Sequence, residues 1–452
     1  MNTYHCKPKQ KLALLLLDKH FFATWLSTDT LHSLSEVYEV VVCVPQKSKS
    51  HVGTNFSEVT FHEFARVTRS HTQEVLSNLN WVGKRDKSPS FKFWLQRNIL
   101  GNEYWNFKNF QYLIKNLKHF MSVMLTNPIL VLAFIPPVRI ILMNLYKSIE
   151  YFQNKTSGYT PADVEIVIVP SQGGSEWEVP EILRNCRRVG VLSVLSIDNW
   201  DNLTSKQVLR FRPDFLTVMG KTAVNQAVEI HGVRKESVLP VGLPRFDVYR
   251  AIETRRRNFV TQQNVFRINY LGFSIPYDEI QLLNRLVDDF KNQNGPSIEL
   301  HYRPHPARKT RFFEAAPDAR IIRPKFSDAS YHNQSIPDPS SYIENMNSFD
   351  LIIATPTTMA IEAMALGIPC VIDATNDGIH RTSPGNAFDN YLHMQDLQTL
   401  SKLSIARTYD QLLNHVLRIY QEWPISIDYE LSDVINLEKK TYVQQLIEYL
   451  PR

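Results

Sequence analysis

One stretch of the chain, residues 350–374, constrains the fold more than any other; it reads DLIIATPTTMAIEAMALGIPCVIDA. Its apolar run Leu351–Ala354 predicts a strand that is buried on both faces. Strong helix formers fill residues 359–366, Gly367 ends that helix, and Cys370–Ile372 predicts a second strand. A strand, a helix and another strand of these lengths form the unit from which parallel sheets are built. The stretch therefore predicts an α/β protein.

The loop between this strand and this helix, Thr355–Thr358, is the part of the unit that can bind a ligand. In open α/β sheets, ligands bind beside the carboxyl ends of the strands. Free backbone N–H groups at a helix start, with the hydroxyls of Thr357 and Thr358, favour an anion such as a phosphate. Alternatively, the two threonines only cap the helix.

A second pattern of the same kind lies upstream. The strand-like run Ile298–His301 is followed at once by YRPHP, which places Arg303 and His305 at the end of a strand. A proline on each side of His305 fixes the backbone there. Together with Arg308, these side chains could each contact a phosphate oxygen or a ribose. Two such motifs in one chain favour a phosphate site over simple capping.

The set RPHP, SFDLIIATPTT and IEAMALGIPCVI resembles the nucleotide-binding half of GT-B glycosyltransferases. More narrowly, it resembles bacterial surface-polysaccharide enzymes, namely the CDP-glycerol glycerophosphotransferase-like group and the transferases that use CMP-activated acidic sugars. In those families a His-Pro motif and a Ser/Thr pair at a helix start hold the donor's phosphate or nucleotide. Here the matching positions are His305-Pro306 and Thr357-Thr358, with threonines where serines are more usual.

The same resemblance implies three further donor contacts. Glu362 matches an acidic residue that often contacts the donor ribose, although an acidic residue also favours the first turns of a helix by its charge alone. The loop that carries Gly272 and Ser274 corresponds to the one that approaches the donor diphosphate.

Length and resemblance together predict the domain organisation. A chain of 452 residues is ample for two cores. The GT-B resemblance implies two Rossmann-like domains whose parallel sheets face each other across a cleft. We expect an acceptor domain at 1–250, a linker at 251–264, a nucleotide-donor domain at 265–430, and a C-terminal helix at 431–452 that could cross back to the first domain.

Four local predictions complete this scheme. Composition predicts helical structure over residues 21–34, 396–423 and 432–450, and a strand over residues 319–322.

The first domain contains a basic and apolar segment at about residues 80–155, which we predict to be a helical insertion. Its most apolar part, Phe120–Leu145, is interrupted by Pro136-Pro137 and Arg139, which argues against a membrane span. We interpret the segment as a patch on an anionic membrane surface, or else as helices packed against the domain with their charges solvated.

Net charge and cysteine usage limit the kind of partner and the cellular compartment that we expect. A net charge of +5 is too small to indicate nucleic acid. The four cysteines are scattered, so a reducing cytoplasm is the simplest location. We therefore expect a cytoplasmic protein, peripheral at the inner face of the cytoplasmic membrane.

Candidate catalytic carboxylates lie in the first domain. The segment IDNWDNLTSK provides Asp198 and Asp201 after a predicted strand, and Glu176 follows another. Similar WDN segments recur in the surface-polysaccharide relatives, and Trp200 could be a wall for a sugar or a docking surface. An inverting transferase needs a base for the acceptor hydroxyl, for which we favour Asp201; a retaining mechanism needs none.

These expectations combine into one function. We expect a glycosyltransferase that moves a sugar from a nucleotide-activated donor to a lipid-linked or lipopolysaccharide acceptor. No DxD motif stands beside a strand, so we expect no metal and no cofactor apart from the donor, which is a co-substrate. The alternatives are a CDP-alditol phosphotransferase, a sugar-nucleotide epimerase of the same fold, and a non-catalytic scaffold.

Overall fold

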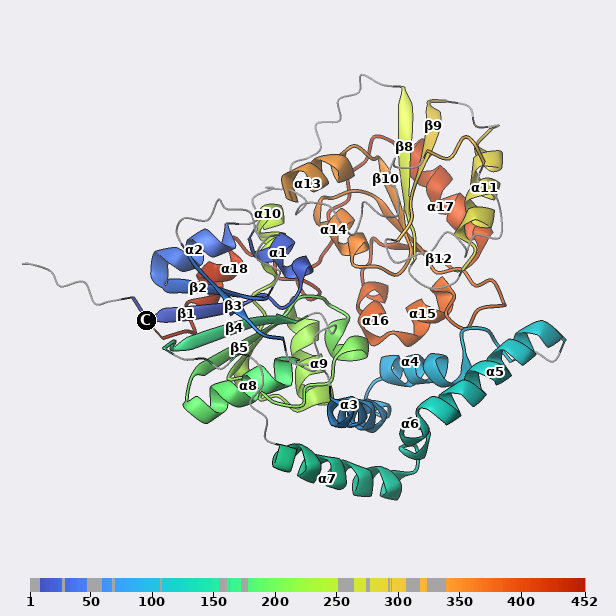
Figure 1. The fold of residues 1–452 in the computed structure, drawn as a ribbon. Coiled ribbons are helices and arrows are strands. Elements are labelled where there is room, and N and C mark those ends of the chain that lie inside the picture. Colours follow the sequence, from blue (N-terminus) through green and yellow to red (C-terminus); the bar gives the residue numbers. More distant parts are fainter. Residues whose placement is uncertain are drawn as a thin grey trace, which may run out of the picture.

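The computed structural model describes most of the chain, and all structural statements below concern this part. The described residues are 9–26, 29–46, 59–66, 70–105, 108–153, 159, 161, 163–171, 178–250, 264–273, 277–291, 293, 295–305, 318–322 and 339–451. They form two α/β domains, each built on a parallel sheet, with a helical insertion in the first domain (Figure 1). The predicted fold class is confirmed.

The first domain is built on seven described strands in the order β3-β2-β1-β4-β5-β6-β7, and each neighbouring pair is parallel. The central strand β1 comes from an apolar run, in which Leu12, Leu14 and Leu15 have no exposed surface. Such runs produce strands that are covered on both faces. The strands are β1 Lys11–Leu15, β2 Glu39–Pro45, β3 Thr60–Phe64, β4 Ile166–Ser171, β5 Leu192–Ile197, β6 Phe215–Thr217 and β7 Val238–Leu239.

Helices cover both faces of this sheet. Figure 1 shows α2 and α18 on one side and α8 on the other. The helices are α1 Lys19–Trp25, α2 Thr30–Val37, α8 Glu178–Val189, the π-helical turn η2 Asn202–Lys206, α9 Lys221–His231, the 3₁₀ turns η3 Lys235–Ser237 and η4 Pro244–Phe246, and α10 Asp247–Arg250.

The second domain has five described strands in the order β12-β11-β10-β8-β9, again all parallel. The predicted unit at 350–374 is confirmed as β10, α14 and β11, and all four residues of β10 are fully buried. The elements are β8 Val265–Leu271, α11 Glu279–Phe290, β9 Ser297–Arg303, α13 Pro339–Asn347, β10 Leu351–Ala354, α14 Met359–Ala365, β11 Cys370–Asp373, α15 Pro384–Asn390, α16 Leu392–Gln398, β12 Ser404–Ala406 and α17 Tyr409–Gln421.

The insertion is a two-layered helical unit. Helix α3 begins at a capping box in which Ser70 and Gln73 exchange hydrogen bonds of 3.2 and 3.0 Å. The inner helices α3 and α4 contact each other, α5 packs on α4, and α7 packs on α3. The helices are α3 His71–Lys84, α4 Pro89–Leu100, α5 Phe110–Thr126, α6 Pro128–Leu132 and α7 Pro136–Gln153. Among these and the other described helices, none has both the length and the apolar character needed to cross a bilayer.

The last part of the chain lies against the first domain. The amide of Asn436 donates to the Met219 carbonyl at 2.7 Å, and the Tyr442 hydroxyl lies 2.9 Å from Thr217 Oγ1 in β6. Helix α18, Tyr442–Leu446, adds its apolar side chains to the first core. These contacts fix the C-terminal segment to the first sheet.

Four local predictions need correction. The predicted helix at 432–450 is helical only in α18; before it, residues 432–434 form a turn, and the Asp433 carbonyl and the Asn436 amide are hydrogen-bonded to the first domain. Residues 396–423 contain the strand β12 between α16 and α17. Residues 21–34 belong to two helices rather than one, and 319–322 makes only a single bridge, His301 to Ile322.

One apolar core belongs to both domains. It includes Trp200, Leu243 and Phe246 from the first domain, and Phe388 and Met394 from the second. Each of these side chains is at most 6% exposed. The two domains are therefore packed firmly together where the candidate site lies.

Candidate active site

The carboxyl ends of strands from the two sheets meet at one contact. Asn199 follows β5 of the first domain, and Thr358 follows β10 of the second. Asn199 Oδ1 accepts hydrogen bonds from Thr358 Oγ1 and from the guanidinium of Arg245, both at 3.2 Å. The Nε atom of Arg245 lies 3.8 Å from Glu362 Oε1 in α14. Two residues from each domain thus join at the strand ends, where open α/β sheets bind ligands.

The predicted threonine pair does not cap its helix through its side chains. Thr358 occupies the N-cap position of α14 but makes no side-chain capping bond, because its hydroxyl donates to Asn199 instead. The hydroxyl of Thr357 is buried and has no hydrogen-bond partner among the described residues. Buried polar groups in folded proteins are nearly always hydrogen-bonded, so an orphaned hydroxyl at a strand end needs an explanation such as a ligand.

Three other predicted donor residues, Gly272, Arg303 and His305, lie along the same edge of the second sheet. Strands β9 and β10 flank β8, and the Gly272 amide, just after β8, donates to the Arg303 carbonyl at 2.9 Å. Arg303 ends β9, and His305 follows two residues later, partly exposed. Neighbouring strands are about 4.8 Å apart, which places the ends of β9 and β10 about 10 Å apart. Strand order reverses direction between β8 and β10, and such a switch point is the usual place for a nucleotide.

Three predicted donor residues, Ser274, Pro306 and Arg308, lie outside the described residues. Their roles stay predictions.

Glu279 is a residue that sequence reasoning missed. It is fully buried at the start of α11 and accepts hydrogen bonds from the Phe273 amide and, at 2.5 Å, from the Tyr302 hydroxyl. A Cβ atom added at Gly272 would lie 2.6 Å from Glu279 Oε2, so the loop passes the carboxylate too closely for a side chain there. The Asp-Glu pair at this helix start was the available signal, but it is equally typical of an ordinary first turn.

The two described candidates for the catalytic base differ in environment. Asp198 is fully buried, and its amide donates to the Ser171 carbonyl at 3.0 Å. Asp201 is 16% exposed, and its Oδ2 lies 2.6 Å from the ammonium of Lys206. Burial alone would raise the pKa of Asp201, but Lys206 and His393 hold it below its ordinary value. Asp201 is therefore ionised at neutral pH.

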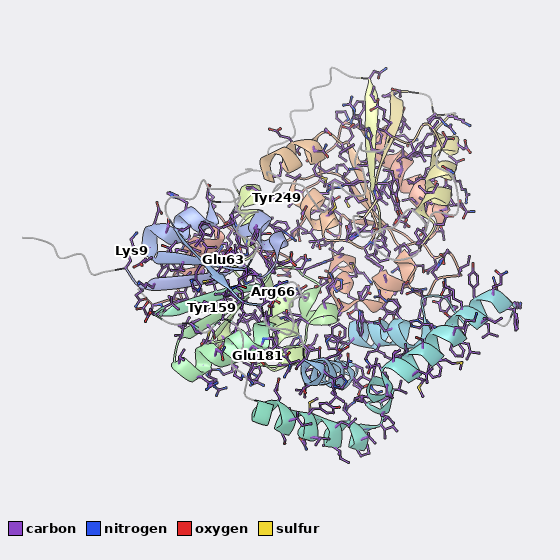
Figure 2. The ribbon with its side chains drawn as sticks, viewed as in Figure 1. Lys9, Glu63, Arg66, Tyr159, Glu181 and Tyr249 are labelled. Carbon is purple, nitrogen blue, oxygen red and sulfur yellow. The ribbon has the colours of Figure 1, made fainter. Side chains whose placement is uncertain are left out.

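The third candidate, Glu176, lies outside the described residues. Its described neighbour Glu178 begins α8, is buried and forms an ion pair with Arg66 at 3.5 Å. Figure 2 labels Arg66 and Glu181 in this part of the first domain. A guanidinium therefore already compensates the charge of the first carboxylate of α8.

His393 was also missed, because it belongs to α16 of the second domain and meets the first domain only in the fold. Its Nδ1 atom lies 2.7 Å from Thr204 Oγ1, and the Trp200 ring contacts it edge-on at 5.0 Å between centroids. Burial lowers the pKa of His393 to about 4, so the ring is neutral at pH 7. Trp200 thus packs between the domains, and the two roles predicted for it, a wall for a sugar or a docking surface, stay predictions.

Several buried polar atoms at this contact and in the neighbouring IDNWDN segment make no hydrogen bond to any described residue, although Arg245 Nε has the ion-pair contact with Glu362 at 3.8 Å. They are Thr357 Oγ1, Arg245 Nε and Asp201 Oδ1, all buried and without a hydrogen bond within the described part of the chain. Together they offer a hydroxyl, a cation and a carboxylate. A phosphorylated donor and a hydroxyl acceptor require groups of these kinds.

Comparison with known proteins gives matches in structure but not in sequence. No family model matches the chain, and no curated protein matches it. Among solved structures, the UDP-N-acetylglucosamine 2-epimerase from Rickettsia bellii has a TM-score of 0.45 at 12% identity, covering 98% of this chain and 97% of that one. The wall teichoic acid polymerase TagF has a TM-score of 0.43 at 9% identity, covering 98% and 88%. The lipopolysaccharide outer core galactosyltransferase WaaB has a TM-score of 0.41 at 10% identity, covering 97% and 98%.

Proposed function

We propose that the protein is a metal-independent glycosyltransferase that moves a sugar from a nucleotide-activated donor to a surface-glycan acceptor. The observation that carries this proposal is the orphaned hydroxyl of Thr357, which is next in the chain to Thr358, the residue that joins Asn199 and, through it, Arg245 where the strand ends of the two domains meet. The phosphate oxygens of a nucleoside diphosphate bound at the β8–β10 switch point would supply the hydrogen-bond acceptor that this hydroxyl lacks.

In this proposal the second domain holds the donor. Arg303 and His305 would neutralise the phosphate charge that grows on the leaving group as the glycosidic bond breaks. Thr357 and Thr358 would donate hydrogen bonds to the same oxygens, and Glu362 would accept from the ribose.

The first domain would hold the acceptor, and Asp201 would take the proton from its hydroxyl. The second carboxylate oxygen, Oδ1, is the atom available for this step, because Oδ2 is occupied by Lys206. The lowered pKa of Asp201 makes its carboxylate a weak base but keeps it ionised. Proton transfer from the acceptor hydroxyl would therefore depend more on the position of the carboxylate than on its basicity. Asp198, fully buried, would instead hold the shape of the loop.

The experiment that tests this function measures products. Purified protein is incubated with CMP-, CDP-, UDP- and GDP-activated donors, with and without a bacterial glycan acceptor, and nucleotides and glycans are analysed by mass spectrometry. The proposal predicts nucleotide release that depends on the acceptor, with the glycan heavier by one sugar. A gain of one alditol phosphate would identify the phosphotransferase instead. Conversion of the donor sugar without any acceptor would identify the epimerase, and no product in any mixture would overturn an enzymatic function.

A further inference from the structure

Exposed apolar side chains are concentrated on the insertion. Twelve of the sixteen exposed large hydrophobic side chains of the described residues lie between Tyr104 and Leu145. The other four, Val189, Ile322, Ile379 and Tyr449, are scattered over the rest of the chain. A monomeric protein in water rarely gathers its exposed apolar side chains in this way.

On α5 these side chains form one stripe. Phe110, Leu117, Met121 and Leu125 are 68%, 45%, 54% and 81% exposed, and their spacings of seven, four and four residues place them on one face of a helix. The opposite face carries the fully buried Asn116 and packs on α4. The exposed face is thus the outer one.

Helix α7 continues this outer layer. Ile140, Ile141 and Leu145 are 59%, 66% and 52% exposed, while the helix packs on α3. Figure 1 shows α5, α6 and α7 at the edge of the molecule, outside α3 and α4. We call the exposed apolar side chains of α5 to α7 the outer apolar surface.

The charge around the outer apolar surface has one sign. Between Glu103 and Glu150 the chain has no acidic residue, while it has Lys108, Lys115, Lys118, Arg139 and Lys147; of these, Arg139 donates to the Val82 carbonyl of α3 at 3.5 Å and so faces inward. Of the two flanking acids, Glu103 is paired with Lys115, and Glu150 is paired with Arg210. A second copy of this chain would bring like charges face to face across a two-fold axis, whereas an anionic lipid surface complements them.

We infer that the outer apolar surface of α5–α7 docks onto an anionic membrane, with the apolar stripe in the lipid interface and the basic side chains against the headgroups. Tyr104 and Trp105, each 38% exposed, precede α5 and are of the type found at membrane interfaces. This docking would hold the protein at the bilayer without crossing it.

The docked insertion would also be connected to the second domain. The Tyr104 amide donates to the Ile379 carbonyl at 3.0 Å, and the Arg381 amide donates to the Asn102 carbonyl at 2.6 Å. Glu103 and His380 form the antiparallel bridge between these hydrogen bonds. Membrane contact at α5 would therefore restrain residues of both domains.

Vesicle flotation of the full-length protein tests this inference. We expect binding to vesicles that contain phosphatidylglycerol, weak binding to phosphatidylcholine alone, and a loss of binding at high ionic strength. Leu125→Glu and Ile141→Glu place a charge in the outer apolar surface and should each lower binding about tenfold or more. Lys118→Gln should lower it about fivefold, since one basic side chain is removed. Val189→Glu, a matched exposed apolar site on α8, should bind like the unchanged protein.

Each variant changes an exposed side chain, so circular dichroism and thermal melting should be unaltered, and size-exclusion chromatography with light scattering gives the oligomeric state. Equal binding by the glutamate variants and the Val189→Glu control would overturn the inference. So would a dimer in solution that ignores vesicles and becomes monomeric in Leu125→Glu, because the surface would then bind a second copy.

Discussion

Thr357→Val should lower the turnover rate by about a hundredfold while leaving the free energy of unfolding unchanged or slightly higher. Valine has the shape of threonine but lacks the hydroxyl, and that hydroxyl has no hydrogen-bond partner in the described structure. Removing an unsatisfied buried polar group is neutral or stabilising. Removing a donor to developing charge in the transition state costs about 10²–10³ in rate. A loss of activity without a loss of stability separates a binding role of this hydroxyl from a structural one.

A matched control lies two residues earlier. Thr355 is fully buried, and its hydroxyl donates to the Leu271 carbonyl at 2.9 Å. Thr355→Val therefore loses an existing hydrogen bond and should lower the free energy of unfolding by about 1 kcal/mol. Urea titration and steady-state kinetics on both variants give the comparison. Full activity in Thr357→Val, together with normal or raised stability, would remove this residue from the site.

The second large effect is expected for Trp200→Ala, which should lower the free energy of unfolding by about 3–5 kcal/mol. Trp200 is 6% exposed within the core that both domains share, and its ring packs against His393 of the second domain. Its removal leaves a cavity between the domains. Besides the loss of stability, we expect the single thermal transition to separate into two, because the domains would unfold less cooperatively.

Trp105 provides the comparison for this substitution. Its ring is 38% exposed, and its Nε1 donates to the Leu100 carbonyl at 2.9 Å. Trp105→Ala should cost about 1 kcal/mol and keep one transition. Differential scanning calorimetry of both variants measures the number of thermal transitions and the loss of stability. A loss at Trp200 no greater than that at Trp105 would mean that the shared core does not hold the domains together.

Much of the fold could be predicted from the sequence because buried parallel strands are continuous apolar runs. Leu351–Ala354 is such a run, and the loop after it carries a threonine pair at the predicted place. Short or irregular elements were harder to predict from the sequence. Strand β12 has three residues, too few to show a period, and the segment before α18 is fixed by hydrogen bonds to distant residues such as Met219.

The sequence predicted the separate parts of the candidate site but not the contacts between them. Motifs placed Thr358 on one strand end and the IDNWDN segment on another, but nothing local indicated that Asn199 would meet Thr358 or that His393 would meet Thr204. Those partners are 159 and 189 residues apart in the chain. Only the packing of the two domains brings them together, and sequence periodicity carries no information on such packing.

The most direct test of the account is isothermal titration calorimetry of the purified protein with CMP, CDP, UDP and GDP. We expect saturable binding of at least one of these nucleotides at a single site per chain. We also expect Thr357→Val to weaken this binding about tenfold, the effect of one hydrogen bond to a charged group. Absence of heat with all of them, confirmed by the absence of any thermal stabilisation, would contradict a nucleotide site at the β8–β10 edge and with it the proposed function.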